Sequence, residues 1–288
     1  MRQPKYLIVG GDMRNFYLAE LLKKEYHRVE IYGFDKKNLK KDLSLAQMIT
    51  DCDVIICGIP LLSAGGYINM PYSEEALPLD TLIEMIPKDA LFVAGKIEKE
   101  VRETLDDKGV NYIDLLDRED MAVLNAIPAA EGAVELILRS TPRTIHNSRI
   151  LILGYGRIGK VLSRILSAFG AEVWVAARTY SDLSWIEAFG YKPVHLNDLE
   201  RYITDMNVIV NTIPYQYITA DILNKVRTDC YLIDLASYPG GIDFRHAEKL
   251  GLKTDWALSL PGKVAPLTAA EIIKKTVENV LTEGGKKK

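Results

Sequence analysis

Three glycines stand at a spacing that suits the binding of a phosphate group. Gly154, Gly156 and Gly159 follow the apolar run RILIL at 149–153 and precede an amphipathic stretch that begins at Arg157. In a strand–turn–helix unit the first glycine allows a tight turn, the second lets the backbone approach a pyrophosphate, and the third lets helix and strand pack closely. The free N–H groups of the helix N-terminus then face the phosphates. A glycine turn without a ligand is the alternative, but the flanking strand and helix favour a dinucleotide site.

The residues after the next predicted strand indicate which dinucleotide is bound. The run VWVAA at 173–177 is followed by Arg178, Thr179 and Ser181, whereas a carboxylate about 20 residues after the glycines would mark a ribose with a free 2′-hydroxyl. An arginine fork matches a 2′-phosphate, and hydroxyl groups can add hydrogen bonds. We therefore expect NADP rather than NAD. The alternative is that Arg178 stacks on adenine or is an ordinary surface charge.

Two later strand ends fall where such a domain contacts its cofactor. The sequence NTIP at 211–214 ends one predicted strand, and the residues after Asp234 follow the next. In open α/β sheets the ligand lies outside the carboxyl ends of the strands. The predicted cofactor-binding residues are Gly154, Tyr155, Gly156, Arg157, Ile158, Gly159, Arg178, Thr179, Ser181, Asn211, Thr212, Ile213, Pro214, Leu235, Ala236 and Ser237.

The elements that position these residues follow from an alternation of short apolar runs and amphipathic segments. Near-continuous apolar strands are typical of parallel sheets covered on both faces. In the first half we predict strands at 5–9, 29–33, 53–57, 90–94 and 111–115, and helices at 15–25, 43–50, 79–86 and 98–107. In the second half we predict strands at 149–153, 172–176, 208–211, 231–235 and 254–257, and helices at 157–169, 181–189, 244–250 and 268–281.

This rhythm predicts an α/β protein with two Rossmann-like, doubly wound domains and a cleft between them. The first domain is expected over 1–140 and the NADP-binding domain over 147–265, with a long helix at 119–139 that kinks or restarts at Pro128. The C-terminal helix, 266–288, either lies on the second domain or crosses back to the first. We favour the crossing, by analogy with two-domain dehydrogenases.

Composition narrows the class of protein. The net charge of −3 over 288 residues gives no electrostatic reason to expect nucleic acid or an anionic membrane as a partner. Cys52, Cys57 and Cys230 are too few for a disulfide framework, so we expect buried thiols, no metal site and a reducing compartment. No apolar stretch approaches a membrane span and no signal peptide is evident, which predicts a cytosolic protein. The lysines at 286–288 are expected to form a solvated terminus.

The first strand ends in GGDMR, which lacks the G-x-G-x-x-G spacing and leaves the first domain free to hold a substrate. With this stretch included, the sequence resembles the family of the dipicolinate synthase A-subunit, the larger subunit of that enzyme. The resemblance covers nearly the whole length and is weakest at 61–79. The matching stretches are GGDMR at 10–14, GFDKK at 33–37, LLDREDMAVLNAIPAAEG at 115–132, TIHNSRILILGYGRIGK at 144–160, NTIP at 211–214, DLASYPGGIDFRHAEKLG at 234–251 and LPGKVAPLTAAEI at 260–272.

The resemblance implies a reaction and a partner. Members of this family act late in making pyridine-2,6-dicarboxylate (dipicolinate) for the spore core during sporulation, in a branch of the lysine and diaminopimelate pathway. The cyclic 4-hydroxy-tetrahydrodipicolinate loses water and gives a hydride to NADP⁺ as its ring becomes aromatic. The smaller, flavoprotein-like dipicolinate synthase subunit is the implied partner, the cytoplasm of the mother cell is the implied location, and a homo-oligomer is expected.

A ring with two carboxylates needs cations or backbone N–H groups at both ends. Arg14, Lys96 and Arg118 follow the first, fourth and fifth predicted strands and would face one edge of the first sheet. Each alone could be an ordinary surface charge, but three at successive strand ends favour a carboxylate site. The predicted substrate-binding residues are Gly11, Arg14, Lys96, Arg118, Asn125 and Lys263, the last in a turn at 261–263.

Asp12, Lys96 and Glu131 are the candidate catalytic residues, with the two carboxylates as proton acceptors. Glu131 fits equally well as a charge at a helix N-terminus after Pro128. His146 lies in the linker, within possible reach of the cleft. The other histidines, His27, His195 and His246, are expected at the surface.

Two other classes of function remain open from the sequence. One is another two-domain NAD(P) dehydrogenase, related to alanine dehydrogenase or to methylene-tetrahydrofolate dehydrogenase, because PGKVAPLT at 261–268 has a loose parallel there. The other is a non-catalytic NADP-binding regulatory protein, which would leave the cations of the first domain without a purpose.

Overall fold

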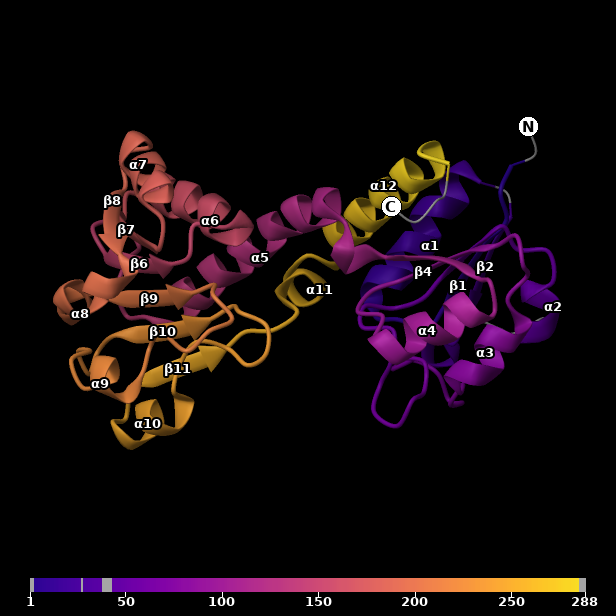
Figure 1. Cartoon of the computed structure of the whole chain (residues 1–288), viewed down its shortest axis with the longest axis horizontal. Coiled ribbons are helices and arrows are strands. Elements are labelled where there is room, and N and C mark those ends of the chain that lie inside the picture. Colours follow the sequence, from indigo (N-terminus) through magenta and orange to yellow (C-terminus); the bar gives the residue numbers. More distant parts are fainter. Residues whose placement is uncertain (1–2, 27, 38–42, 285–288) are drawn as a thin grey trace. The chain divides into compact units, whose positions relative to one another are not determined.

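Two parallel β-sheets organise the chain, and each has its own core. The structure is a computed structural model that describes residues 3–26, 28–37 and 43–284. The chain divides into one unit of Met1–Leu124 with Ala265–Lys288 and a second unit of Asn125–Val264 (Figure 1). Each unit is described by itself, and the cleft expected between them stays a prediction. The predictions for His27 and for residues 286–288 lie outside the described residues.

The sheet of the first unit has the order β2-β1-β3-β4-β5, with every pairing parallel. Four of its strands are almost entirely buried, which explains their unbroken apolar runs. Its strands are β1 (Tyr6–Val9), β2 (Val29–Tyr32), β3 (Val54–Ile56), β4 (Leu91–Ala94) and β5 (Asn111–Asp114).

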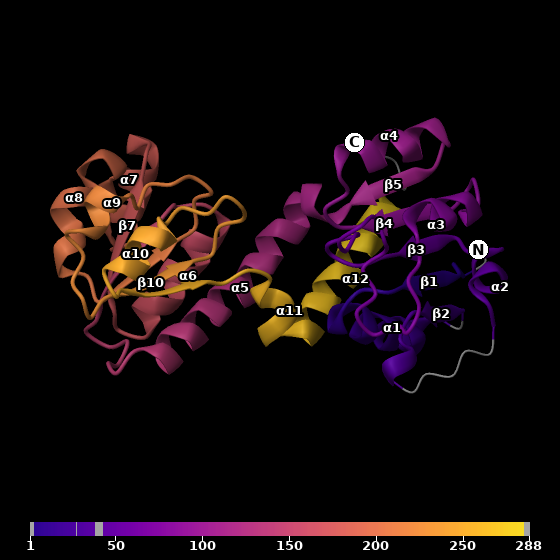
Figure 2. The same ribbon diagram turned by 90° about the horizontal axis from the view of Figure 1, so that it is seen from below.

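Helices cover both faces of this sheet. One face packs against α2 (Leu45–Ile49), α3 (Leu79–Met85) and α4 (Lys99–Asp107). The other packs against α1 (Met13–Glu25), the start of α5 (Glu119–Ser140) and α12 (Pro266–Thr282). Figures 1 and 2 both show α12 beside α1. The C-terminal helix therefore returns to the first sheet, in agreement with the favoured prediction.

The sheet of the second unit has the order β11-β10-β9-β6-β7-β8, again all parallel. This is the order of the dinucleotide-binding fold, with the first strand at the centre and the chain reversing between β6 and β9. Its strands are β6 (Arg149–Leu153), β7 (Glu172–Ala177), β8 (Lys192–His195), β9 (Val208–Asn211), β10 (Tyr231–Asp234) and β11 (Lys253–Trp256).

One face of the second sheet carries α5, α6 (Arg157–Ala168) and α7 (Tyr180–Ala188), and the other carries α8 (Leu199–Tyr202), α9 (Ala220–Leu223) and α10 (Phe244–Lys249). Figure 1 shows α6 and α7 on one side of the strands and α9 and α10 on the other. Short 3₁₀ helices lie at Asp35–Lys37, Leu115–Asp117, Leu196–Asp198 and Ile203–Asp205. The turn expected at 261–263 is instead part of a helix, α11 (Leu260–Val264).

The helix α5 differs from the sequence prediction in two respects. It continues through Pro128 as one element, so no new helix starts there. The division between the units falls inside α5, after Leu124, rather than at residue 140, because Ala130, Ala133 and Ile137 pack in the core of the second unit. This helix is also long and apolar enough, by length and composition alone, to cross a membrane, contrary to the sequence analysis, but 56% of the apolar window is buried.

Candidate nucleotide and substrate sites

The glycine loop of the second unit is shaped by close backbone contacts. Gly154 has a φ of +99°, and a Cβ there would lie 2.4 Å from Thr212 Oγ1. A Cβ at Gly159 would lie 2.0 Å from the carbonyl oxygen of Gly154, so only glycine lets α6 approach the loop. At Gly156 a Cβ would meet nothing within 4 Å. The loop therefore leaves open space at Gly156, where the backbone of this fold approaches a pyrophosphate.

The N-terminus of α6 is suited to an anion. Its N-cap is Gly156, which supplies no side-chain hydrogen bond, and its first turn has no acidic residue. The first N–H groups of a helix lack partners within the helix and carry partial positive charge. A dinucleotide pyrophosphate fits this donor set, and Arg157, exposed beside it, adds a positive charge.

Tyr155 and Ile158 contribute less than their place in the motif suggests. The Tyr155 side chain is 8% exposed and packs in the core beside α6 and β7. Burial raises the pKa of its hydroxyl, with smaller effects from Tyr191 and Asp182. Tyr155 therefore has mainly its backbone to offer a cofactor, and Ile158 is half-buried.

At the end of β7, the side chains predicted to select NADP differ in whether they already have hydrogen-bond partners within the protein. Arg178 and Ser181 are exposed, and within the described ranges neither side chain has a hydrogen bond or ion pair. Thr179 instead caps α7: its hydroxyl accepts from Asp182 N at 3.2 Å and donates to Asp182 Oδ2 at 2.7 Å. The predicted role of the Thr179 hydroxyl is therefore corrected, because helix capping uses it.

A buried pair organises the loops after β9 and β10. Asn211 and Asp234 are both 0% exposed, and Asn211 Nδ2 donates to Asp234 Oδ1 at 2.8 Å. Asp234 also accepts from Ala236 N and Gly241 N, and Asn211 bonds the N–H and C=O of Ile213. Asn211 was predicted to bind the cofactor, but its amide is used inside the protein.

The remaining predicted cofactor residues lie on these two loops. Thr212 donates its hydroxyl to Leu153 O at 2.8 Å and so lies against the glycine loop. The others range from exposed to buried: Pro214 and Ser237 are exposed, Ile213 and Leu235 are half-buried, and Ala236 is buried.

In the first unit, loops at the carboxyl ends of β1, β3 and β4 meet closely. A Cβ at Gly58 would lie 2.9 Å from the Cα of Gly11, and a Cβ at Gly95 would lie 2.6 Å from Ile59 Cγ1. Gly11 has a φ of +86°, and its N–H donates to Asn69 O at 2.7 Å. Gly58 and Asn69, which contact Gly11 in this loop cluster, were not among the site residues predicted from the sequence. They lie in or next to residues 61–79, where the family resemblance is weakest.

Two of the three predicted carboxylate-binding cations already have carboxylate partners. Arg14 is 5% exposed and forms a two-pronged ion pair with Asp12, with Nε–Oδ1 at 2.9 Å and Nη2–Oδ2 at 2.8 Å. Arg118 pairs with Asp120 and with Glu283, 165 residues away, and these bonds raise its pKa. Both predicted roles are corrected, because each guanidinium is neutralised within its own unit.

Lys96 is different. It is exposed after β4, its backbone N–H donates to Asp114 Oδ1 at 3.0 Å, and its ammonium has no hydrogen bond or ion pair within residues 3–26, 28–37 and 43–284. Asp12 caps α1 and is engaged by Arg14. Among the candidates on the first sheet, Lys96 is thus the charge left for a ligand.

The other candidates belong to the second unit. Glu131 is exposed in the middle of α5 and Lys263 is exposed at the end of α11, whereas Asn125 is half-buried and its Oδ1 has no partner among described residues. A shared site with Lys96 stays a prediction. His146 packs against Gly170 at the amino end of β7, on the far edge of the sheet from the glycine loop, which corrects its predicted reach to a substrate.

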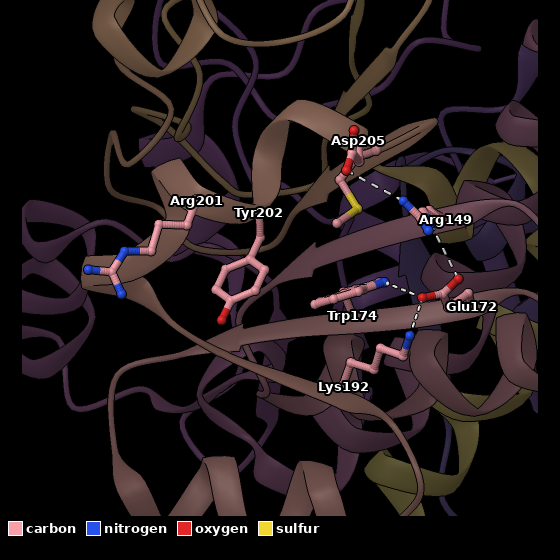
Figure 3. Close-up of a pocket in the computed structure, with 8 residues that line it drawn as sticks. Arg149, Glu172, Trp174, Lys192, Arg201, Tyr202 and Asp205 are labelled. Atoms are coloured by element: carbon pink, nitrogen blue, oxygen red, sulfur yellow. Dashed lines mark hydrogen bonds and ion pairs between the residues drawn. The ribbon is translucent and has the colours of Figure 1, made fainter.

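A pocket of about 290 Å³ lies at the amino ends of β6, β7 and β8, opposite the glycine loop. Figure 3 shows most of its charges bound to one another: Arg149 reaches both Glu172 and Asp205, and Lys192 and Trp174 reach Glu172. Arg201 lies apart from them and pairs with Asp198. The hydrogen bond from Lys192 lowers the pKa of Glu172. This is an internally paired surface network. Among the described residues no group of three or more His, Cys, Asp or Glu side chains could hold a metal ion.

Comparison with known proteins agrees with this architecture. Residues 5–116 match the family of the dipicolinate synthase A-subunit N-terminal domain, and residues 131–236 match "D-isomer specific 2-hydroxyacid dehydrogenase, NAD binding domain". The dipicolinate synthase A-subunit of Bacillus subtilis (strain 168) is 30% identical over 285 residues, 97% of this chain and 96% of that protein. The chain belongs to the dipicolinate synthase A-subunit family.

Solved structures support the same assignment. The dipicolinate synthase A-subunit from Bacillus halodurans superposes with a TM-score of 0.88 at 31% identity, covering 96% of this chain and 97% of that one. An L-alanine dehydrogenase gives a TM-score of 0.62 at 14% identity, covering 96% of this chain and 90% of that one, which shows a shared fold alone. Membership in the A-subunit family, with a dehydrogenase-type NAD-binding domain, supports an oxidoreductase role with a nicotinamide cofactor.

Proposed function

We propose that the chain oxidises a cyclic dicarboxylate to pyridine-2,6-dicarboxylate with NADP⁺ as the hydride acceptor. The observation that carries this proposal is the open cradle at Gly156 on the N-terminus of α6, in a chain of the dipicolinate synthase A-subunit family. The substrate, 4-hydroxy-tetrahydrodipicolinate, loses one water to give a dihydro ring. That ring then loses a hydride and a proton to become aromatic, which balances the reaction.

The cofactor, when bound, supplies the hydride acceptor, and the residues of the chain hold and orient the two reactants. The α6 N-terminus binds the pyrophosphate, and Arg178 with Ser181 receives the 2′-phosphate. Lys96 binds one substrate carboxylate. Glu131, exposed on α5, is the proposed proton acceptor, since Asp12 is committed to Arg14. Because aromatisation is itself favourable, positioning of the C–H bond supplies most of the acceleration.

Membership in the family supports a proposal for the partner and the setting. We propose that the smaller, flavoprotein-like dipicolinate synthase subunit associates with this chain in the cytoplasm of a sporulating mother cell, and that the chain itself forms a homo-oligomer. The smaller subunit either raises the rate of this chain or is required for it.

An absorbance assay tests the function. Purified chain is mixed with freshly generated 4-hydroxy-tetrahydrodipicolinate and NADP⁺, with and without the smaller subunit, and NADPH and dipicolinate are quantified. Equal amounts of both products are expected. Tight NADP⁺ binding without either product, in the presence of both subunits, would contradict the proposal and favour a regulatory role.

A further inference from the structure

Lys96 has a backbone conformation that lysine rarely adopts. Its φ is 58°, in the left-handed region, which is unfavourable for a residue with a Cβ. The chain before it is clamped, because Gly95 N donates to Gly58 O and Gly95 O accepts from Leu61 N. A Cβ at Gly95 would also lie 2.6 Å from Ile59 Cγ1, so the loop packs tightly there.

One buried carboxylate clamps the chain on the other side. Asp114 is the last residue of β5, and its side chain is 2% exposed. Oδ1 accepts from Lys96 N at 3.0 Å, and Oδ2 accepts from Ile97 N at 2.7 Å. Two more donors complete the carboxylate: Leu116 N at 2.9 Å and Arg102 Nη2 at 2.6 Å. Arg102 Nε also donates to Ile97 O at 2.7 Å, which fixes both backbone groups of Ile97.

These contacts hold the backbone of Lys96, whose side chain is exposed and whose ammonium has no partner among the described residues. A strained residue persists only where its surroundings over-determine it, and such residues gather at functional sites. A lysine held in this way loses less freedom on binding an anion than one on a flexible loop. Lys96 therefore combines a strained backbone with an ammonium that is unpaired within the described part of the chain. It lies at the carboxyl edge of the sheet, where ligands of open α/β folds bind.

We propose that Asp114 is a positioning residue, which holds Lys96 in its left-handed conformation so that the ammonium stands ready for a substrate carboxylate. This inference rests on the proposed function and adds the residue that orders its substrate site. Asp114 itself touches no substrate, since its four hydrogen bonds all lie within the protein.

Calorimetric titration of the full chain with pyridine-2,6-dicarboxylate, in saturating NADP⁺, tests this. Lys96→Ala should weaken dicarboxylate binding about 10- to 100-fold, because a charge-assisted hydrogen bond is lost. Asp114→Asn should weaken it to a similar extent. Asp114→Asn placed in the Lys96→Ala background should add less than about twofold, because both changes act on one interaction. In turnover assays, Lys96→Ala and Asp114→Asn should each raise KM for the dicarboxylate substrate and leave KM for NADP⁺ unchanged.

Asp117→Asn is the matched control. Arg102 Nη1 donates to Asp117 at 2.6 Å, so the variant removes an ion pair of the same arginine but keeps all four bonds to Asp114. Its dicarboxylate affinity should equal that of the wild type. Unchanged binding in Lys96→Ala would overturn the substrate site of the proposed function. Two outcomes would overturn the positioning role of Asp114 alone. In one, Lys96→Ala loses dicarboxylate affinity but Asp114→Asn does not; in the other, the two losses of affinity add in the double variant.

Lys96→Gly provides a second test that leaves Asp114 in place. Glycine adopts a positive φ without penalty, so this variant should have a higher thermal midpoint than Lys96→Ala, although both lose the ammonium. Both should lose dicarboxylate affinity equally. An equal or lower midpoint for Lys96→Gly would show that no strain is stored there.

Discussion

At the residue scale, Arg178 would bind the nucleotide through its charge, whereas the glycines of the nucleotide loop act through their lack of a side chain. Arg178 is exposed and has no ion pair in the described part of the chain, while its neighbour Thr179 is committed to Asp182. Recognition of a 2′-phosphate then depends on the guanidinium more than on the threonine hydroxyl. The glycines act through their lack of a side chain: a Cβ at Gly156 would enter open space, whereas one at Gly159 would collide with the carbonyl oxygen of Gly154.

Arg178→Ala should lower NADP affinity about 10- to 100-fold and change NAD affinity less than about threefold, because only NADP has the phosphate that the arginine binds. Fluorescence titration with both nucleotides measures this. Arg178→Lys is the control and should keep part of the preference, since a point charge remains. Equal losses for both nucleotides would remove the 2′-phosphate assignment.

Gly159→Ala and Gly156→Ala should separate stability from binding. A Cβ at residue 159 would lie 2.0 Å from Gly154 O, and such overpacking destabilises by about 1–3 kcal/mol. A Cβ at residue 156 enters open space, so that variant should keep its unfolding free energy but lose about tenfold or more in nucleotide affinity. Denaturant melts and nucleotide titrations measure the two effects. A stable Gly159→Ala variant with full affinity would contradict the loop geometry.

At the element scale, Arg118 joins the start of α5 to Glu283, the residue that follows the last turn of α12. It donates to Asp120 and to Glu283, and Asp120 also accepts from Asn279 at 2.9 Å. The last helix of the chain is therefore held to the first unit by a charged network as well as by its apolar face. This explains why a cation at a strand end is not available to a substrate.

Arg118→Met should lower the unfolding free energy by about 1 kcal/mol, as expected for a partly exposed network, and leave dicarboxylate affinity unchanged. Denaturant melts and calorimetry measure the two quantities, with Lys96→Ala as the opposite case. A loss of affinity without a loss of stability would return Arg118 to the substrate site.

The same network predicts a pH dependence. Hydrogen bonds from Arg118, then from Asn279, lower the pKa of Asp120 to about 2 from an ordinary 3.8. A depressed folded-state pKa contributes stability that is complete above the unfolded pKa and is lost as the pH falls through the folded one. Thermal melts should therefore show a smaller loss between pH 4 and pH 2 in Asp120→Asn than in the wild type. Parallel curves would show that Asp120 contributes nothing to acid sensitivity.

At the scale of the whole molecule, the three cysteines can report on each unit. Cys52 and Cys57 lie in the first unit and Cys230 in the second, all buried. Burial raises the pKa of Cys52 to about 11 and raises those of Cys57 and Cys230 further. We expect negligible labelling by a thiol reagent in the native chain and full labelling in denaturant. Mass spectrometry would assign each label, and rapid native labelling would contradict the packing.

The strands and helices could be predicted because they depend on local pattern. Buried parallel strands such as RILIL and VIVN are continuous apolar runs, and their predicted bounds match β6 and β9. The strand β8 was missed because KPVH is mostly exposed and contains a proline. The motif glycines could be found by spacing, whereas the pairing of Arg118 with Glu283 joins residues far apart in sequence and could not. The structural roles of Asp114 and Asp234 left only a weak signal in the sequence. Each is an aspartate that ends a buried strand, in NYID and YLID.

Direct hydride transfer on this chain is the central claim, and an isotope experiment tests it. Substrate with deuterium at every ring carbon, which labels the hydride whichever C–H bond supplies it, is incubated with the chain, NADP⁺ and the smaller subunit. The nucleotide is then analysed by mass spectrometry. The account predicts NADPH that carries one deuterium for each dipicolinate formed, and no such product with NAD⁺ at equal, limiting concentration. Dipicolinate formed while the NADPH carries no deuterium would contradict it.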